Sequence, residues 1–313
     1  MISQAAAAPV ATAPPLGAPR RRSSFNRYRL APLILISGNV VLFALFFVWP
    51  GAIGFMYSFT DYRGIGDADF VGLENYRALF EDTAFFAAFT RTLFYAVMTV
   101  PLTYVLSLAV ASLLVSKFTR GKGVARVIFF IPWLLSPIVT GVIWRWMFGE
   151  NFGLVNFLIQ SMGGSSVLWQ SDANLSLMVV VLASAWGGMA FNMLLFIAAI
   201  KNVPTEYYEA AELDGANSWA KFRNITLPGI APTSFLVILL STLGAIKEFA
   251  MIQALNSGGP GTENNLLVQY IYRSGFQNGQ VGYASAASMV LMAILLVIAL
   301  AQLWVNKRRS ANR

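Results

Sequence analysis

The sequence of 313 residues contains neither cysteine nor histidine. Without cysteine, the chain has no disulfide framework, no thiolate metal site and no cysteine nucleophile. Without histidine, it lacks the commonest general base and metal ligand, and a Ser-His-Asp triad is excluded. An enzyme built from this chain would have to depend on carboxylates.

Charged residues are also scarce. They make up 12% of the sequence, whereas a soluble domain averages about 25%. Hydrophobic residues reach 57%, so the composition predicts a polytopic membrane protein. The net charge of +8 could indicate nucleic-acid binding, but the positive residues flank apolar runs. We therefore expect a lipid bilayer as the surroundings, and no nucleic-acid partner.

A phosphate-binding loop of the pattern GxxxxGK[ST] is missing as well. The segment Gly121-Lys122-Gly123 is too short and precedes no suitable strand. We therefore expect that the chain does not hydrolyse ATP, is not itself catalytic and binds no cofactor or metal of its own.

Residues 1–31 are rich in Ala and Pro and then basic, and no acidic residue occurs before Asp61. This composition predicts a disordered cytoplasmic tail. A cleaved signal peptide is not expected, because its charged region should lie close to the start. An organelle transit peptide is a minor alternative. Residues 32–313 then form the membrane domain.

Six apolar runs are long enough to cross a bilayer, which takes about 20 residues each. Their presence predicts an all-α polytopic protein with six transmembrane helices. Pro and Gly interrupt several of the runs, as is common in membrane helices. The expected spans lie near residues 32–58, 92–115, 124–148, 176–200, 230–255 and 282–305.

The distribution of Lys and Arg predicts the orientation, because cytoplasmic segments are enriched in both. With the amino terminus inside, most of these residues outside the spans fall on the inner side. The outer segments hold only Arg63, Arg77, Arg91 and Arg273. Both termini, and the loop over residues 201–229, are therefore expected in the cytoplasm.

The loop between the fourth and fifth runs is the most polar interior part of the chain. Residues 206–228 read EYYEAAELDGANSWAKFRNITLP. Acidic residues and Ala favour a first short helix after Pro204, and Gly215 can end it with a positive φ. Asn217 or Ser218 can cap a second short helix. Pro228 is expected to end the irregular stretch before the next apolar run.

This loop resembles that of a known family. The order Glu209-Ala210-Ala211, Gly215, Ile225 and Leu227-Pro228 resembles the EAA loop of permease subunits in ATP-binding-cassette importers. An ordinary cytoplasmic loop with an incidental Glu-Ala-Ala is the alternative. The resemblance implies the type I importer permease fold, with residues 202–229 as a cytoplasmic coupling-helix loop. The implied coupling residues are Glu206, Glu209, Ala210, Ala211, Asp214, Gly215, Leu227 and Pro228.

Other segments resemble the carbohydrate branch of this family. Asp214 and Ala216 beside the Gly do so, as do Phe70–Tyr76 after the first span and Ser257-Gly258-Gly259-Pro260. The last element is similar to the maltose-permease half of the usual permease pair. The resemblance runs from about residue 32 to the last span and does not cover the tail.

The resemblance implies a complete machine around this chain, in a bacterial inner (plasma) membrane. Its parts are a second, homologous permease, two ATP-binding cassette subunits that carry ATP and Mg, and an extracytoplasmic solute-binding lipoprotein. The implied cargo is a di- or oligosaccharide, of the trehalose or maltose type. The same machine with glycerol-3-phosphate or a glycerophosphodiester as cargo is the alternative.

Two other functional classes remain as weaker alternatives. An ion-coupled secondary transporter would predict internal repeats and function without an ATPase. No internal repeat is visible, and the acidic loop would have no role there. A membrane enzyme with a carboxylate site would need a polar cluster at one face of the bilayer. Asp67, Asp69 and Glu74 form such a group, and they are typical of a solvated surface.

Polar residues within the spans are candidates for the substrate pathway, because a charge in the bilayer costs a few kcal/mol and usually faces a cavity or a partner. Lys247 and Glu248 are adjacent in the fifth span, about 100° apart on a helix. Asn192 and Gln253 are further candidates. The alternative is a structural role, as an inter-helix ion pair or hydrogen bond.

Aromatic residues could stack on the apolar face of a sugar ring. The candidates in the spans are Tyr104, Trp144, Trp146 and Trp186. Trp and Tyr also gather at membrane interfaces, and Trp144 and Trp146, beside Arg145, favour that second interpretation.

Overall fold

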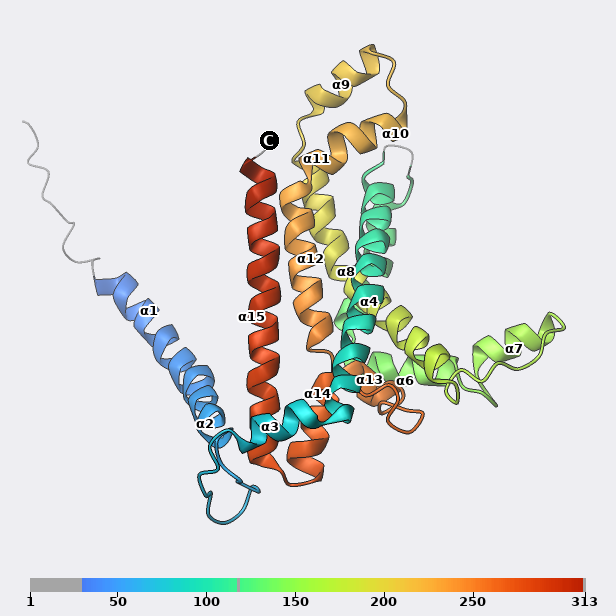
Figure 1. The fold of residues 1–313 in the computed structure, drawn as a ribbon. Coiled ribbons are helices and arrows are strands. Elements are labelled where there is room, and N and C mark those ends of the chain that lie inside the picture. The colour runs from blue at the N-terminus through green and yellow to red at the C-terminus, as the bar shows by residue number, and fades with distance from the viewer. Residues whose placement is uncertain (1–29, 117–118, 312–313) are drawn as a thin grey trace, which may run out of the picture. The chain divides into compact units, whose positions relative to one another are not determined.

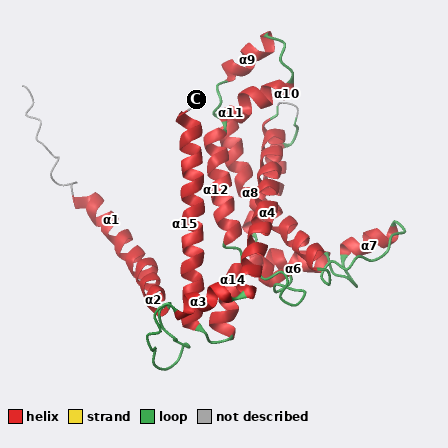
Figure 2. Ribbon diagram, viewed as in Figure 1, coloured by secondary structure: helices red, strands yellow, loops and turns green. Residues whose placement is uncertain are grey.

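The computed structural model describes residues 30–116 and 119–311. Its regular structure is helical, with an isolated bridge between Thr60 and Phe70 (Figures 1 and 2). The all-α fold class is therefore confirmed. The predicted disordered tail lies outside the described residues, except for Leu30 and Ala31, which already belong to a helix.

The chain divides into two compact units, Met1–Ala52 and Ile53–Arg313. Helix α1 (Leu30–Phe43), in the first unit, passes through a π-helical turn, η2 (Ala44–Val48), into α2 (Trp49–Tyr57), within which the second unit begins. Pro50 follows this turn, and a proline removes one N–H from the helical ladder. Ile36–Tyr57 is long and apolar enough to cross a membrane, as expected for the first span.

Three long helices of the second unit each meet the requirements for a membrane span. They are α4 (Thr83–Val115), α8 (Ala173–Lys201) and α15 (Val281–Ala311) (Figure 1). Asp82 caps α4 by accepting from the backbone N–H of Ala84 at 2.7 Å. This cap explains why the second span begins at Thr83, well before the expected residue 92.

The third span is not the continuous helix that the apolar run predicted. It consists of α5 (Lys122–Leu134) and α6 (Pro137–Met147), whose axes are bent by 101°. Ser136 adopts an extended conformation, as a residue before proline prefers, and its Oγ accepts from the N–H of Val139 at 3.2 Å. Pro137 then starts a new helix at a position where its missing N–H is harmless.

The fifth span is also interrupted, which corrects the expected helix over 230–255. Helix α12 (Ala231–Ile246) ends before Lys247, and α13 (Ala250–Leu255) begins after Phe249. Glu248 Oε1 accepts from the N–H of Met251 at 2.8 Å, so its carboxylate caps α13. Lys247 and Glu248 therefore do not lie 100° apart on a common helix.

The number of spans depends on how these bends are counted. The described residues contain four continuous helices that can cross a membrane, and up to six spans if each bent pair is one. The second bent pair joins residues 218–229 to α12 at 70°. The six expected spans are compatible with the upper count, with bends that the apolar pattern did not show.

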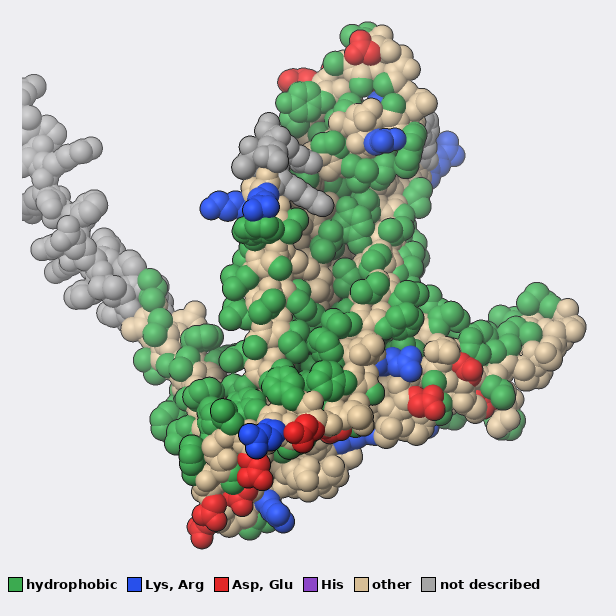
Figure 3. Space-filling view, viewed as in Figure 1, with side chains coloured by type: hydrophobic (Ala, Val, Ile, Leu, Met, Phe, Trp, Pro, Cys, Tyr) green, Lys and Arg blue, Asp and Glu red, His purple; other side chains and the backbone are tan. Residues whose placement is uncertain are grey.

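Helices α4, α8 and α12 pack together around two apolar clusters. One contains Tyr95, Leu177 and Ile252, and the other contains Leu108, Phe196 and Ile230. These clusters hold the spans against one another along their length. The space-filling view shows hydrophobic side chains along α12 and α15, with charged side chains toward the helix ends (Figure 3). This pattern is typical of helices in a bilayer.

A third cluster joins α3 (Glu74–Glu81), α4, α14 (Leu267–Tyr272) and the start of α15, and the π-helical turn η4 (Arg273–Gln277) follows α14. The hydroxyls of Tyr270 and Tyr283 donate to Asp82. Partial burial by itself raises the pKa of Asp82, but hydrogen bonds from Tyr270, the Ala84 N–H and Tyr283 hold that pKa below its ordinary value. This contact ties three helix ends together.

Helix α7 (Leu154–Ser161) is held to the segment before α8 by Asn156. The buried Asn156 amide donates to the carbonyls of Glu150 and Val167, both at 2.9 Å, and its Oδ1 accepts from the Trp169 indole at 3.0 Å. A side chain with this many partners closes the loop as a folded element.

Candidate functional site

The two short helices expected in the polar loop are confirmed. They are α9 (Thr205–Leu213) and α10 (Ser218–Lys221), at the upper end of the spans in Figure 1. Helix α10 continues through a π-helical turn, η3 (Phe222–Thr226), into α11 (Leu227–Gly229). Pro228 thus lies inside a helical run, and the expectation that it ends an irregular stretch is wrong. Proline is tolerated because it occupies the first turn of α11.

The turn between these helices depends on Gly215. Its φ is 75°, a left-handed conformation that glycine adopts without steric cost. The N–H of Asp214 donates to Ala210 O at 3.0 Å, and the N–H of Ala216 donates to Ala211 O at 2.9 Å. Asn217 Oδ1 accepts from the N–H of Ala220 at 2.8 Å. Asn217, rather than Ser218, is therefore the cap of α10.

Side chains hold α9 and α10 together as one structural unit. Lys221 Nζ lies 2.8 Å from Glu212 Oε1, and the hydroxyls of Tyr208 and Thr226 lie 2.9 Å apart. Leu227 packs beneath the loop with Ile230 in an apolar cluster of the spans. Helix α9 is therefore tied by the Tyr208–Thr226 hydrogen bond to the segment that leads into α12.

Most of the predicted coupling residues lie at the surface of this unit. Ala211 and Leu227 are half-buried, so Leu227 anchors the loop instead of presenting a surface. The exposed members are Glu206, Glu209, Ala210, Asp214, Gly215 and Pro228.

Three large apolar residues of this unit are exposed, and the sequence pattern did not predict them as contact residues. Leu213 is 91% exposed, and Tyr207 and Trp219 are also largely exposed. Leu213 comes directly before the Asp-Gly stop, so a helix ending there leaves it without core contacts. An apolar residue beside a helix stop in a polar loop is the signal that could have found it. Exposed apolar residues rimmed by charges are typical of a protein contact surface.

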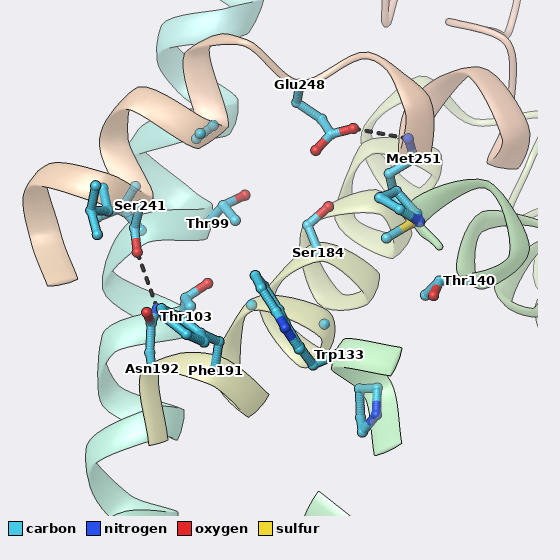
Figure 4. Close-up of a pocket in the computed structure, with 18 of the residues that line it drawn as sticks. Thr99, Thr103, Trp133, Thr140, Ser184, Phe191, Asn192, Ser241, Glu248 and Met251 are labelled. Carbon is cyan, nitrogen blue, oxygen red and sulfur yellow. Dashed lines mark hydrogen bonds between the residues drawn. The ribbon is translucent and has the colours of Figure 1, made fainter. Parts of the chain in front are cut away.

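A cavity of about 550 Å³ lies among α4, α5, α6, α8, α12 and α13 (Figure 4). Its polar lining consists of hydroxyls, an amide and a carboxylate, and three aromatic rings contribute to the wall. The residues concerned are Tyr95, Thr99, Thr103, Trp133, Thr140, Ser184, Phe191, Asn192, Ser241 and Glu248.

Two of the four predicted pathway residues meet in this cavity. Asn192 is buried and its Nδ2 donates to Ser241 Oγ at 3.2 Å, which joins α8 to α12. Glu248 lines the cavity from the break after α12. Lys247 is exposed and does not line the cavity. Gln253 accepts from Gln269 Nε2 at 2.9 Å, a contact between α13 and α14 outside the lining.

The aromatic wall consists of residues that the sequence did not single out. The rings of Trp133 and Phe191 stack with centroids 4.8 Å apart and planes at 23°. Trp133 lies near the end of α5, just before the break, and reaches the cavity where α5 packs against α8. The predicted Tyr104, Trp144, Trp146 and Trp186 are not among the lining residues, and Trp144 stacks on Phe148 instead.

The hydroxyl groups of the wall had a weak signal in the sequence. Thr99 and Thr103 are four residues apart in α4 and therefore share one face of that helix. Together with Ser184, Asn192 and Ser241 they supply both donors and acceptors. A wall of this kind suits a polar solute with an apolar face. Among residues 30–116 and 119–311, no group of three or more acidic, His or Cys residues is placed to hold a metal.

Comparison with known proteins identifies the family. Residues 84–311 match the family model described as "Binding-protein-dependent transport system inner membrane component". An arabinooligosaccharides transport system permease protein of Bacillus subtilis is 35% identical over 284 residues, which cover 90% of each chain. An sn-glycerol-3-phosphate transport system permease protein of Agrobacterium fabrum is 30% identical and covers 90% of this chain and 96% of its own.

The fold also matches a solved structure. One chain in the crystal structure of a bacterial ABC transporter involved in the import of the acidic polysaccharide alginate superposes with a TM-score of 0.80. The match covers 90% of this chain and 96% of that chain, at 22% identity, so it concerns the fold alone. From the family match and the two permease relatives together, the chain belongs to the family of binding-protein-dependent transport system inner membrane components.

Proposed function

We propose that this chain is one membrane-spanning permease subunit of an ATP-driven importer for a saccharide or a similar polyhydroxylated solute. The observation that carries the proposal is that one chain combines two features. One is a cavity wall of hydroxyls, an amide and stacked rings. The other is an exposed helical hairpin, formed by α9 and α10, that an ion pair and a hydrogen bond hold together. The wall provides a path for a polar solute through the spans. The hairpin provides a place where another protein can move them.

The partners follow from what one chain lacks. A polar solute needs a pathway enclosed by protein on all sides, so a second, homologous permease completes the cavity. Two ATP-binding cassette subunits, which bind ATP and Mg, dock on the hairpins of the two permeases. An extracytoplasmic lipoprotein delivers the solute. Two relatives are transport system permease proteins for arabinooligosaccharides and sn-glycerol-3-phosphate, which supports a carbohydrate-type cargo.

The hairpin supplies the contacts for coupling. The exposed Glu209 carboxylate can bind an Arg or Lys of an ATPase subunit, and exposed Ala210 allows close approach of another surface. Movement of α9 passes through the Tyr208–Thr226 hydrogen bond and the packed Leu227 to α12. The packed spans then rock as rigid bodies between inward-facing and outward-facing states.

The decisive experiment is reconstitution of the complete complex in proteoliposomes. Uptake of a labelled saccharide should require ATP, the solute-binding lipoprotein and the ATPase subunits together. Equal uptake by a preparation without the ATPase subunits would contradict the proposal and favour an ion-coupled transporter.

Orientation is part of the same proposal: residues 32–313 form the membrane domain of a bacterial inner-membrane protein, and both termini and the hairpin face the cytoplasm. Because the chain has no cysteine, Ser218→Cys and Thr262→Cys each introduce a unique thiol at an exposed position. A membrane-impermeant maleimide should label Thr262→Cys in spheroplasts and Ser218→Cys only after permeabilisation. The reverse pattern would show the opposite orientation.

A further inference from the structure

Over residues 30–116 and 119–311, the lining of the cavity contains a negative charge and no positive one. Of the lining residues that the structure describes, Glu248 alone carries a formal charge, and neither Lys nor Arg lines the cavity. The neighbouring Lys247 is exposed and outside the lining. Within the part of the chain that the structure describes, the wall therefore presents a carboxylate that forms no ion pair.

The position of Glu248 leaves its carboxylate available to a solute. Its Oε1 accepts from the N–H of Met251 at 2.8 Å, and the side chain points toward the cavity between Thr99 and Ser184 (Figure 4). Neighbouring hydroxyls of a sugar can donate to a carboxylate, which only accepts hydrogen bonds. A phosphate or a carboxylate of a solute offers no such donor and is repelled, more strongly where water is displaced.

We propose that Glu248 makes this pathway selective for uncharged, hydroxyl-rich solutes and against anionic ones such as phosphate esters and uronates. The inference rests on the proposed function and concerns the charge of the cargo, which the relatives leave open. The names of two relatives include arabinooligosaccharides, which are neutral, and sn-glycerol-3-phosphate, which is an anion.

Glu248→Gln separates this role from helix capping. Glutamine keeps a side-chain oxygen that can accept from the Met251 N–H, so α13 remains capped while the charge is removed. Glu81→Gln, at an exposed position of α3, removes one carboxylate away from the cavity and is the matched control.

The test is equilibrium binding of labelled probes to the purified complex of both permeases and both ATPase subunits, without the binding protein. Three matched pairs serve as probes: trehalose and trehalose 6-phosphate, trigalactose and trigalacturonate, and glycerol and sn-glycerol 3-phosphate. In the wild type we expect a neutral member to bind at least about tenfold more tightly than its anionic partner. Glu248→Gln should reduce that ratio to about threefold or less, and Glu81→Gln should leave it unchanged.

Three results would overturn the inference: an unchanged ratio in Glu248→Gln, tighter binding of the anionic partners to the wild type, or no saturable binding of any neutral probe. The wild-type ratio needs no variant, so the test stands even if Glu248→Gln does not assemble. ATP-driven uptake that persists with an unchanged ratio would refute this inference and leave the proposed function intact. Loss of ATP dependence in the wild type would refute the proposed function itself.

Discussion

Gly215→Val is expected to lower ATP-driven uptake about tenfold while the spans remain folded and assembled. Gly215 has a φ of 75° in the turn between α9 and α10. A β-branched residue in this conformation costs about 1–2 kcal/mol, and 1.4 kcal/mol changes a conformational equilibrium tenfold. The turn would therefore adopt another geometry, and α9, which carries both Glu209 and Ala210, would no longer be held against α10 in the position that the ATPase contact requires.

The expected loss of uptake does not come from a clash with neighbouring atoms, because a Cβ added at Gly215 would meet nothing within 4 Å. The control is Gly215→Asn, since asparagine tolerates the left-handed conformation better than other residues with a Cβ. Uptake and solute-stimulated ATPase activity of reconstituted complexes provide the readout. Equal activities of the valine and asparagine variants would show that the backbone conformation of this turn is not what coupling requires.

Gly141→Val is expected to destabilise the folded chain by about 3 kcal/mol, the upper end of the usual penalty for overpacking. Gly141 lies in α6, where a Cβ would come within 2.8 Å of both Ala254 Cβ and Met251 O, and 3.2 Å from Leu255 N. Two of these neighbours are backbone atoms of α13, which cannot turn aside as a flexible side chain can. The valine would force α6 and α13 apart.

The consequence reaches the cavity, because Thr140 beside Gly141 and Met251 on α13 both line it. Gly123→Ala is the control, because a Cβ added at Gly123 meets nothing within 4 Å. Alanine also favours a helix more than glycine does. Thermal unfolding of the detergent-purified chain provides the measurement. A melting temperature of Gly141→Val as high as that of Gly123→Ala would show that the contact between α6 and α13 adapts without cost.

Local signals in the sequence were sufficient for the two short helices of the loop, although not for the helical run around Pro228. The start after Pro204, the Gly215 turn and a cap at Asn217 each depend on residues within one helical turn. The same is true of the number and approximate positions of the apolar runs. The breaks in the third and fifth spans were missed because the residues on both sides of Ser136 and of Lys247–Glu248 are mostly apolar. The direction of a helix after such a break depends on the residue that caps the next helix.

The cavity could not be predicted in the same way. Asn192 and Glu248 were found because a polar group in a membrane span needs a partner or a cavity. Trp133, Thr99 and Ser241 were missed, because as single residues they are common in apolar helices. Lys247 and Gln253 had the same signal as Glu248, yet the break after α12 leaves Lys247 exposed and Gln253 bonded to Gln269.

By itself, the sequence determined that this is a helical membrane protein with a folded polar hairpin between two apolar runs, since hydrophobicity, caps and turn residues act over short stretches of chain. Only the tertiary structure decided which side chains share a wall. Asn192 and Ser241 are 49 residues apart and lie in contact. Such a pairing depends on how α8 and α12 pack and on the direction in which broken helices resume, and neither property belongs to any short stretch of sequence.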